Sequence, residues 1–185
     1  MKDEIPEGYA RVTEILSPYN DFTQIDHDVL ARAADRGSRV HAYCEAYALG
    51  LFLPELDADC KPYVESFIDW FDAMVELVIH AEIRLNCPIM KISGQCDLIV
   101  QLKGDTHVSI IDIKTPATAS KSWRLQTAAY QLLAKRSLDL DCTRRACLML
   151  PKSGRSSALI EFDNHQKDQD LFLNAVELFW FFKKK

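Results

Sequence analysis

The sequence of 185 residues predicts an α+β fold in which a small mixed sheet is flanked by helices. Two changes of pattern predict it. Apolar residues recur at helical spacing until about residue 77, and the spacing typical of strands begins at about residue 78. A further helical stretch then separates these strands from another apolar strand. We therefore expect a single domain of residues 1–185, with a helical part at about 1–77, a sheet core at about 78–162 and a C-terminal helix at about 166–185.

Two helices are expected before the sheet. Between about residues 28 and 49, apolar side chains such as Val40 and Cys44 are separated by three or four residues, and Gly50 is typical of a residue that ends a helix. A second helix, at about 59–77, carries a stripe of apolar residues: Val64, Phe67, Ile68, Phe71, Met74 and Val75.

Three strands are expected next, at about 78–85, 91–102 and 107–114, the last two forming a hairpin around Lys103-Gly104-Asp105. In the last strand apolar residues point to both faces, with Ile110 on one side and Ile111 on the other. This pattern is typical of a central strand that is covered on both faces. After it, the pattern indicates a helix at about 120–134, a buried strand at 146–150, an edge strand at 158–162 and a largely apolar helix at 171–182.

Composition and charge argue against several classes of protein. The net charge of −5 and the pI near 5.5 disfavour binding of nucleic acid through bulk electrostatics, but they leave room for a local basic groove. No apolar run approaches the roughly 18 residues that cross a membrane, and no apolar segment follows the charges at the N-terminus. The six cysteines lack the two-residue spacing of zinc-ribbon and iron–sulfur motifs. We therefore expect a cytoplasmic protein with buried free thiols.

The end of the third expected strand has the sequence Asp112-Ile113-Lys114. Because alternate strand residues share a face, Asp112 and Lys114 lie on the same side, and Ile113 points into the packing. Asp97, on the preceding strand, adds a second carboxylate. Two carboxylates and an ammonium group suit a phosphate together with Mg²⁺ or Mn²⁺. The alternative is a surface ion pair between Asp112 and Lys114, which would add little stability, and on this motif alone the two interpretations have equal weight.

Three further residues could join such a site. His41 and Glu45 lie four residues apart on the first expected helix, so they are neighbours on its surface. They could supply a metal ligand and its supporting carboxylate, or they could be a packed histidine and a solvated glutamate. Glu82, within the first expected strand, would be either a third acid of the metal site or a solvent-facing residue on an edge strand.

The helix at about 120–134 carries groups that suit nucleic acid. Gln126 and Tyr130 share one of its faces, and Lys121 and Arg124 add positive charge near its start. Together with Trp123, these groups could hold a phosphate backbone and stack a base. The alternative is an amphipathic helix whose aromatic residues contact the core.

Taken in order, four motifs resemble those of the PD-(D/E)XK nuclease superfamily: Gly37-x-x-x-His41, Gly94-x-x-Asp97, Asp112-x-Lys114-Thr115 and Gln126-x-x-x-Tyr130. The resemblance covers about residues 37–150 and is strongest to the RecB-like and lambda-exonuclease-like branch. The segments Arg11-Val12-Thr13-Glu14-Ile15-Leu16 and Arg36-Gly37-Ser38 also resemble those of phage or prophage members. It implies an αβββαβ, restriction-endonuclease-like core that cuts phosphodiester bonds with one or two divalent ions.

The resemblance also implies roles for individual residues. His41, Asp97 and Asp112 would bind the metal, with the backbone carbonyl of Ile113 as one more ligand, and Lys114 would be the catalytic lysine. Gln126 and Tyr130 would position the nucleic acid, whereas Glu82 matches no motif. Some members of the superfamily hold an iron–sulfur cluster with four cysteines, three of them near the C-terminus. Here only Cys142 and Cys147 lie in that region, so no cluster is expected.

The function expected from the sequence is a Mg²⁺- or Mn²⁺-dependent DNA nuclease. We expect an exonuclease that requires a DNA end and acts in phage-type recombination, replication or repair, in the cytoplasm of a bacterium or a phage-infected host. The alternatives are a catalytically silent nucleic-acid-binding module and a partner-dependent endonuclease with the same fold. The apolar C-terminal helix could dock on a second copy of the chain or on a recombination or replication partner.

Overall fold

The structure is a computed structural model that describes residues 4–20, 25–115 and 119–183. The extreme N-terminus and the last two residues of the expected C-terminal helix, 184 and 185, lie outside the described residues. The elements in chain order are β1 (Ala10–Arg11), α1 (Val12–Leu16), the 3₁₀ helix η1 (Ser17–Tyr19), α2 (His27–Ala48), α3 (Lys61–Met74), β2 (Val75–Cys87), β3 (Ile92–Leu102), β4 (Val108–Lys114), α4 (Ser122–Leu138), β5 (Cys142–Met149), β6 (Ala158–Glu161) and α5 (His165–Lys183).

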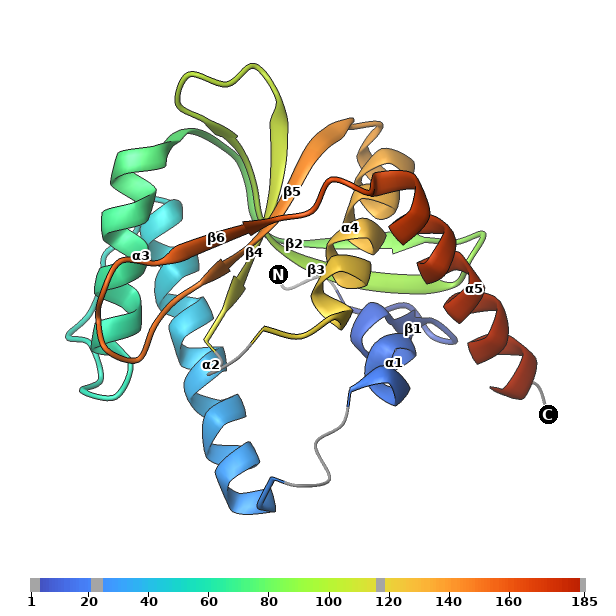
Figure 1. The fold of residues 1–185 in the computed structure, drawn as a ribbon, viewed down its shortest axis with the longest axis horizontal. Coiled ribbons are helices and arrows are strands. Elements are labelled where there is room, and N and C mark those ends of the chain that lie inside the picture. Colours follow the sequence, from blue (N-terminus) through green and yellow to red (C-terminus); the bar gives the residue numbers. More distant parts are fainter. Residues whose placement is uncertain (1–3, 21–24, 116–118, 184–185) are drawn as a thin grey trace.

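Within the described ranges, six strands form one mixed sheet (Figure 1). Its main path runs β1-β3-β4-β5-β6, and the long strand β2 pairs with β3. The β1–β3 and β4–β5 pairs are parallel, whereas the β2–β3, β3–β4 and β5–β6 pairs are antiparallel. From α2 to β5 the order is helices, three strands, a helix and a strand, so the predicted α+β core is confirmed.

Helices cover both faces of this sheet (Figure 1). On one face, Ile110 packs with residues of α1, α4 and α5, including Leu133 and Phe172. On the other face, Ile111 packs with residues of α2 and α3, including Val40 and Phe67. The prediction that β4 is a central strand with two covered faces is therefore confirmed.

Several bounds differ from the sequence-based expectation: β2 spans 75–87 rather than 78–85, α4 ends at residue 138 rather than 134, and β5 begins at residue 142 rather than 146. The helix expected to reach residue 77 ends at Met74, because Val75 pairs with Leu102 as the first residue of β2 and its side chain is buried in the core beside α3. The N-terminal part also contributes β1 to the sheet, where Ala10 pairs with Ile92. These two- and five-residue elements, β1 and α1, are too short to produce a periodic pattern in the sequence.

The structure also tests what the sequence predicts about the cysteines and about membrane-spanning helices. All six cysteines are buried and free, as predicted. Among the helices in the described parts of the chain, none is both long and apolar enough to cross a membrane.

Candidate active site

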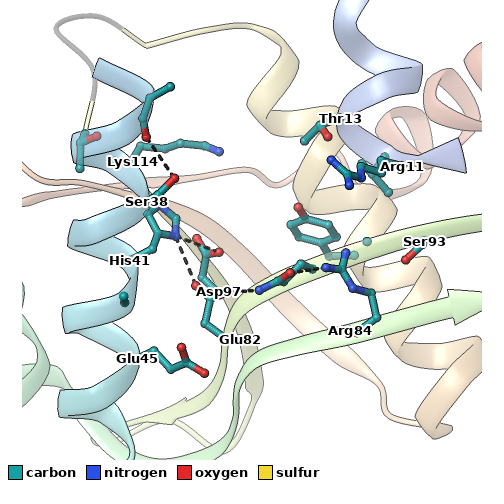
Figure 2. A pocket seen from close by; sticks show the side chains of 18 of the residues that line it. Arg11, Thr13, Ser38, His41, Glu45, Glu82, Arg84, Ser93, Asp97 and Lys114 are labelled. Carbon is teal, nitrogen blue, oxygen red and sulfur yellow. Dashed lines mark hydrogen bonds and ion pairs between the residues drawn. The ribbon is translucent and has the colours of Figure 1, made fainter. Parts of the chain in front are cut away.

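A pocket of about 770 Å³ opens between α2, the β2–β3 pair and the N-terminal segment that contains α1 (Figure 2). One side carries His41 and Glu45 from α2, and Glu82 and Asp97 from the sheet. Arg11, Thr13 and Arg84 lie on the opposite side. The pocket therefore has an acidic end and a cationic end.

The acidic end forms where the β2–β3 pair becomes irregular. On β3, Cys96 and Leu98 are two residues apart and yet pack in the cores on opposite faces of the sheet, so the usual alternation breaks at Asp97. On β2, Ala81 pairs with Leu98 and Ile83 pairs with Cys96, which places Glu82 level with Asp97. Glu82 has a φ of 48°, in the left-handed region that non-glycine residues rarely adopt. This local distortion brings two acids from neighbouring strands to the same wall of the pocket.

His41, Glu82 and Asp97 form a compact group of potential metal ligands, with one ligand atom from each residue within 4.8 Å of the others. His41 Nδ1 lies 3.3 Å from Glu82 Oε1 and 3.3 Å from Asp97 Oδ1. Burial alone would lower the pKa of His41, but the two carboxylates raise it well above its usual value. Imidazole nitrogen and carboxylate oxygen are ligands that proteins offer to divalent metal ions, so this donor set fits such a cation.

The Asp97 carboxylate is fixed in position by a backbone amide of the neighbouring strand β4. The amide of Ile113 donates a hydrogen bond of 2.6 Å to Asp97 Oδ2, which leaves Oδ1 directed at His41. Burial raises the pKa of Asp97, but His41, Lys114 and the Ile113 amide together lower it below its ordinary value. The carboxylate is therefore ready to accept a cation at neutral pH.

Asp112 and Lys114 form an ion pair of 2.6 Å that is buried rather than at the surface, with side chains 2% and 18% exposed. Asp112 lies outside the three-residue ligand group. Burial and the nearby Asp97 raise its pKa to about 6, although Lys114 opposes that shift. Burial would lower the pKa of Lys114, but Asp112 and Asp97 raise it, so the side chain is an ammonium group at neutral pH.

Gln126 and Tyr130 of α4 hold this ion pair in place. Gln126 Oε1 accepts a 3.0 Å hydrogen bond from Lys114, and Gln126 Nε2 lies 3.2 Å from Asp112 Oδ1 and 2.8 Å from the Tyr130 hydroxyl. A Cβ atom at position 94 would lie 2.8 Å from the Tyr130 ring, so Gly94 allows α4 to approach β3. The four motifs of the sequence analysis, which contain His41, Asp97, the Asp112–Lys114 pair and Gln126 with Tyr130, therefore lie next to one another in the structure.

The other predicted residues lie in different positions. Glu45 lines the pocket, and Glu82 faces it rather than solvent. Lys121 is exposed at the N-cap of α4 and Arg124 donates a 2.9 Å hydrogen bond to Asp168 of α5; neither lines the pocket. Sequence reasoning gave no role in the site to Arg11, Arg84 and Gln95, which do line the pocket. Two features of the sequence could have pointed to two of them. Arg84 lies two residues after Glu82 on the same strand, and Gln95 lies within the Gly94-x-x-Asp97 motif.

Comparison with known proteins identifies the family. A family model for the PD-(D/E)XK nuclease superfamily matches residues 19–176. No curated protein matches the chain. The crystal structure of SSO0001 is similar, with 16% identity and a TM-score of 0.48 over 95% of this chain and 79% of that chain. An alkaline exonuclease from Laribacter hongkongensis has 14% identity and a TM-score of 0.43 over 92% and 89%. Its complex with dAMP has 15% identity and a TM-score of 0.41. Because the family match spans most of its length, this chain belongs to the PD-(D/E)XK superfamily of metal-dependent nucleases.

Proposed function

We propose that the protein is a DNA exonuclease that requires a strand end and uses Mg²⁺ or Mn²⁺ held by His41, Glu82, Asp97 and Asp112. The observation that carries the proposal is the convergence of His41, Glu82 and Asp97 at one end of the pocket, beside the buried Asp112–Lys114 pair. The likeness of its motifs to phage-type members supports a role in recombination, replication or repair.

The residues of the acidic end would hold the cation. A divalent ion at this position would polarise a phosphoryl oxygen and lower the pKa of water. His41 would hold it through a neutral ring nitrogen, so metal binding would require His41 without its second proton. Ile113 keeps the Asp97 carboxylate in position through its amide, and its carbonyl is the proposed additional ligand.

Lys114 supplies positive charge next to these ligands. Its ammonium group is held at 2.6 Å from Asp112 and 3.0 Å from Gln126, in an orientation set by α4. A positioned cation stabilises negative charge that develops on the phosphate in the transition state. This role suits Lys114 better than proton abstraction from water, because Asp112 and Asp97 keep the side chain protonated and an ammonium group has no lone pair to accept a proton.

The volume and charge of the pocket support the end of a DNA strand as the substrate. Its volume of about 770 Å³ is that of a small-molecule site, so it would receive a few nucleotides of one strand. Arg11 and Arg84 at the opposite end provide a local cationic surface for phosphates, although the chain as a whole carries a net charge of −5.

The proposal is tested by incubating end-labelled linear single-stranded DNA, linear duplex and closed circles with Mg²⁺, Mn²⁺ or EDTA. We expect metal-dependent loss of the linear DNA alone. Lys114→Ala should slow the reaction by about 10²-fold or more, which corresponds to at least roughly 2.7 kcal/mol of barrier. Lys61→Ala, which removes an exposed lysine on α3, is the matched control and should cut like the parent.

The possible results separate the alternatives. Cutting of closed circles would make the protein an endonuclease with the same site. A folded parent that binds Mn²⁺ and cuts none of these DNAs would support the silent binding module. Unchanged cutting by Lys114→Ala would contradict the role proposed for the lysine.

A further inference from the structure

A chain of hydrogen bonds connects the acidic end of the pocket to its cationic end. Gln95 Nε2 donates to Glu82 Oε2, and Arg84 Nη2 donates to Gln95 Oε1. Figure 2 labels Glu82 and Arg84, the two ends of this chain. The other carboxylate oxygen of Glu82, Oε1, lies 3.3 Å from His41 Nδ1. Gln95 is half-buried and lies two residues before Asp97 on β3, so its backbone is fixed by the same strand as the proposed metal ligand.

The order of these bonds determines how the Gln95 amide is oriented. An arginine side chain can only donate hydrogen bonds, whereas an ionised glutamate can only accept them. With Arg84 on one side, the oxygen of the Gln95 amide must face the guanidinium group, and its NH₂ group must face Glu82. Arg84 therefore selects the amide orientation that can hold the Glu82 carboxylate.

Glu82 needs such support because its backbone is in an unfavourable conformation. A left-handed φ is unfavourable for a residue with a side chain and persists only where the surroundings hold it. The other two acids of the site each have a donor that fixes their carboxylate: the Ile113 amide for Asp97, and Lys114 with Gln126 for Asp112. For Glu82, the corresponding donor is the side-chain amide of Gln95.

We propose that Gln95, oriented by Arg84, is a positioning residue that fixes the Glu82 carboxylate for metal binding. This inference rests on the proposed function, because it takes Glu82 as a ligand. Gln95 itself contributes neither a ligand nor a reacting group. Loss of its amide donor should allow Glu82 to turn away from His41 and Asp97, which would leave the metal with fewer preorganised ligands.

The experiment compares Gln95→Met with the parent. Methionine keeps the length of the side chain but donates no hydrogen bond to Glu82. Residues that support metal ligands typically contribute 10–100-fold to metal affinity, so we expect the dissociation constant for Mn²⁺, measured by electron paramagnetic resonance of the free ion, to rise about 10–100-fold. Higher Mn²⁺ concentrations should restore DNA cutting, and KM for DNA at saturating Mn²⁺ should stay unchanged. A merely structural role would not be relieved by added metal.

Two further variants complete the test. Gln101→Met is the matched control, because Gln101 lies on the same strand, donates to the backbone carbonyl of Asp105 and does not line the pocket. It should bind Mn²⁺ like the parent. Arg84→Leu removes the group that orients the Gln95 amide, so it should also weaken Mn²⁺ binding, by a smaller factor than Gln95→Met.

Parental Mn²⁺ affinity in a folded Gln95→Met protein would overturn the inference, as would lost activity that added Mn²⁺ does not restore. The proposed function would remain in the first case, provided that Asp97→Asn abolishes Mn²⁺ binding. A parent that binds no Mn²⁺ would instead overturn the proposed function itself, and the inference with it.

Discussion

Gly94 shows how a single residue determines whether the site can form. Its position lies against the Tyr130 ring and the Leu133 side chain, where an added Cβ would come within 2.8 and 2.9 Å. Both neighbours are buried, with exposures of 3% and 0%, so neither can move aside freely. Displacement of Tyr130 would also disturb Gln126 and, through it, the Asp112–Lys114 pair.

We therefore expect Gly94→Ala to lower the free energy of unfolding by about 1–3 kcal/mol, the usual range for overpacking a core. Gly37→Ala is the contrasting control. Among the residues that the structure describes, a Cβ there would meet only Thr115 Oγ1, at 3.6 Å, and alanine is favoured over glycine within a helix by about 1 kcal/mol. Urea denaturation of the three proteins measures both effects. Equal stability of Gly94→Ala and the parent would show that α4 does not approach β3 as described.

The predictability of the site also varies from residue to residue. Asp112 and Lys114 could be placed on one face because they follow the period of two along an apolar strand. Glu82 could not be placed, because its position depends on a left-handed φ and on the broken alternation of the neighbouring strand. Gln95 acquires its role only through contacts with residues 11 and 13 positions away, which no local pattern in the sequence reveals.

At the scale of elements, α5 is attached to the sheet and α4 by a buried polar cluster. Arg145 of β5 forms an ion pair with Asp168 of α5, and both side chains are almost fully buried, with exposures of 0% and 1%. Arg145 Nε also donates a 3.2 Å hydrogen bond to Nδ1 of His165, the first residue of α5. Burial and the neighbouring Arg145 lower the pKa of His165 below its usual value.

This lowered pKa predicts a pH dependence of stability. The unfolded chain binds a proton at His165 near pH 6.5, whereas the folded protein binds it only at lower pH. The contribution of His165 is therefore fully present above pH 6.5 and is lost as the pH falls through the folded pKa. The unfolding free energy of the parent minus that of His165→Asn should decrease between pH 7.5 and pH 5. A difference that stays constant, or increases on acidification, would contradict this account.

Most elements were predictable from the sequence, including the four-residue strand β6, whereas β1 and α1 were not. Helix α2 and strands β3 and β4 have enough residues to repeat an apolar pattern, and their predicted bounds lie close to the observed ones. The end of α3 was placed three residues too late, because the apolar residues Val75 and Leu77 fit either a helical stripe or a strand. The pairing of Val75 with Leu102, a residue far away in the sequence, places Val75 in a strand rather than in the helix.

At the scale of the whole molecule, the candidate active site lies between the two hydrophobic cores that cover the two faces of the sheet. The α2–α3 core supplies His41, the sheet supplies the acids and Lys114, and the α1–α4–α5 core supplies Tyr130 and the segment with Arg11. Near the C-terminal end of α5, the side chains of Phe181 and Phe182 are 71% and 79% exposed. A partner or second copy docking on this helix stays a prediction.

The central claim is that the cluster of His41, Glu82 and Asp97, beside Asp112, holds the metal ion of this nuclease. The most direct measurement is an anomalous difference map from crystals of the protein soaked in Mn²⁺. We predict the strongest peak within coordination distance of His41 and Asp97, with Glu82 adjoining it and Lys114 alongside. A strongest peak elsewhere, for example at the exposed acidic residues Asp57 and Asp59, with none beside His41, would contradict the account.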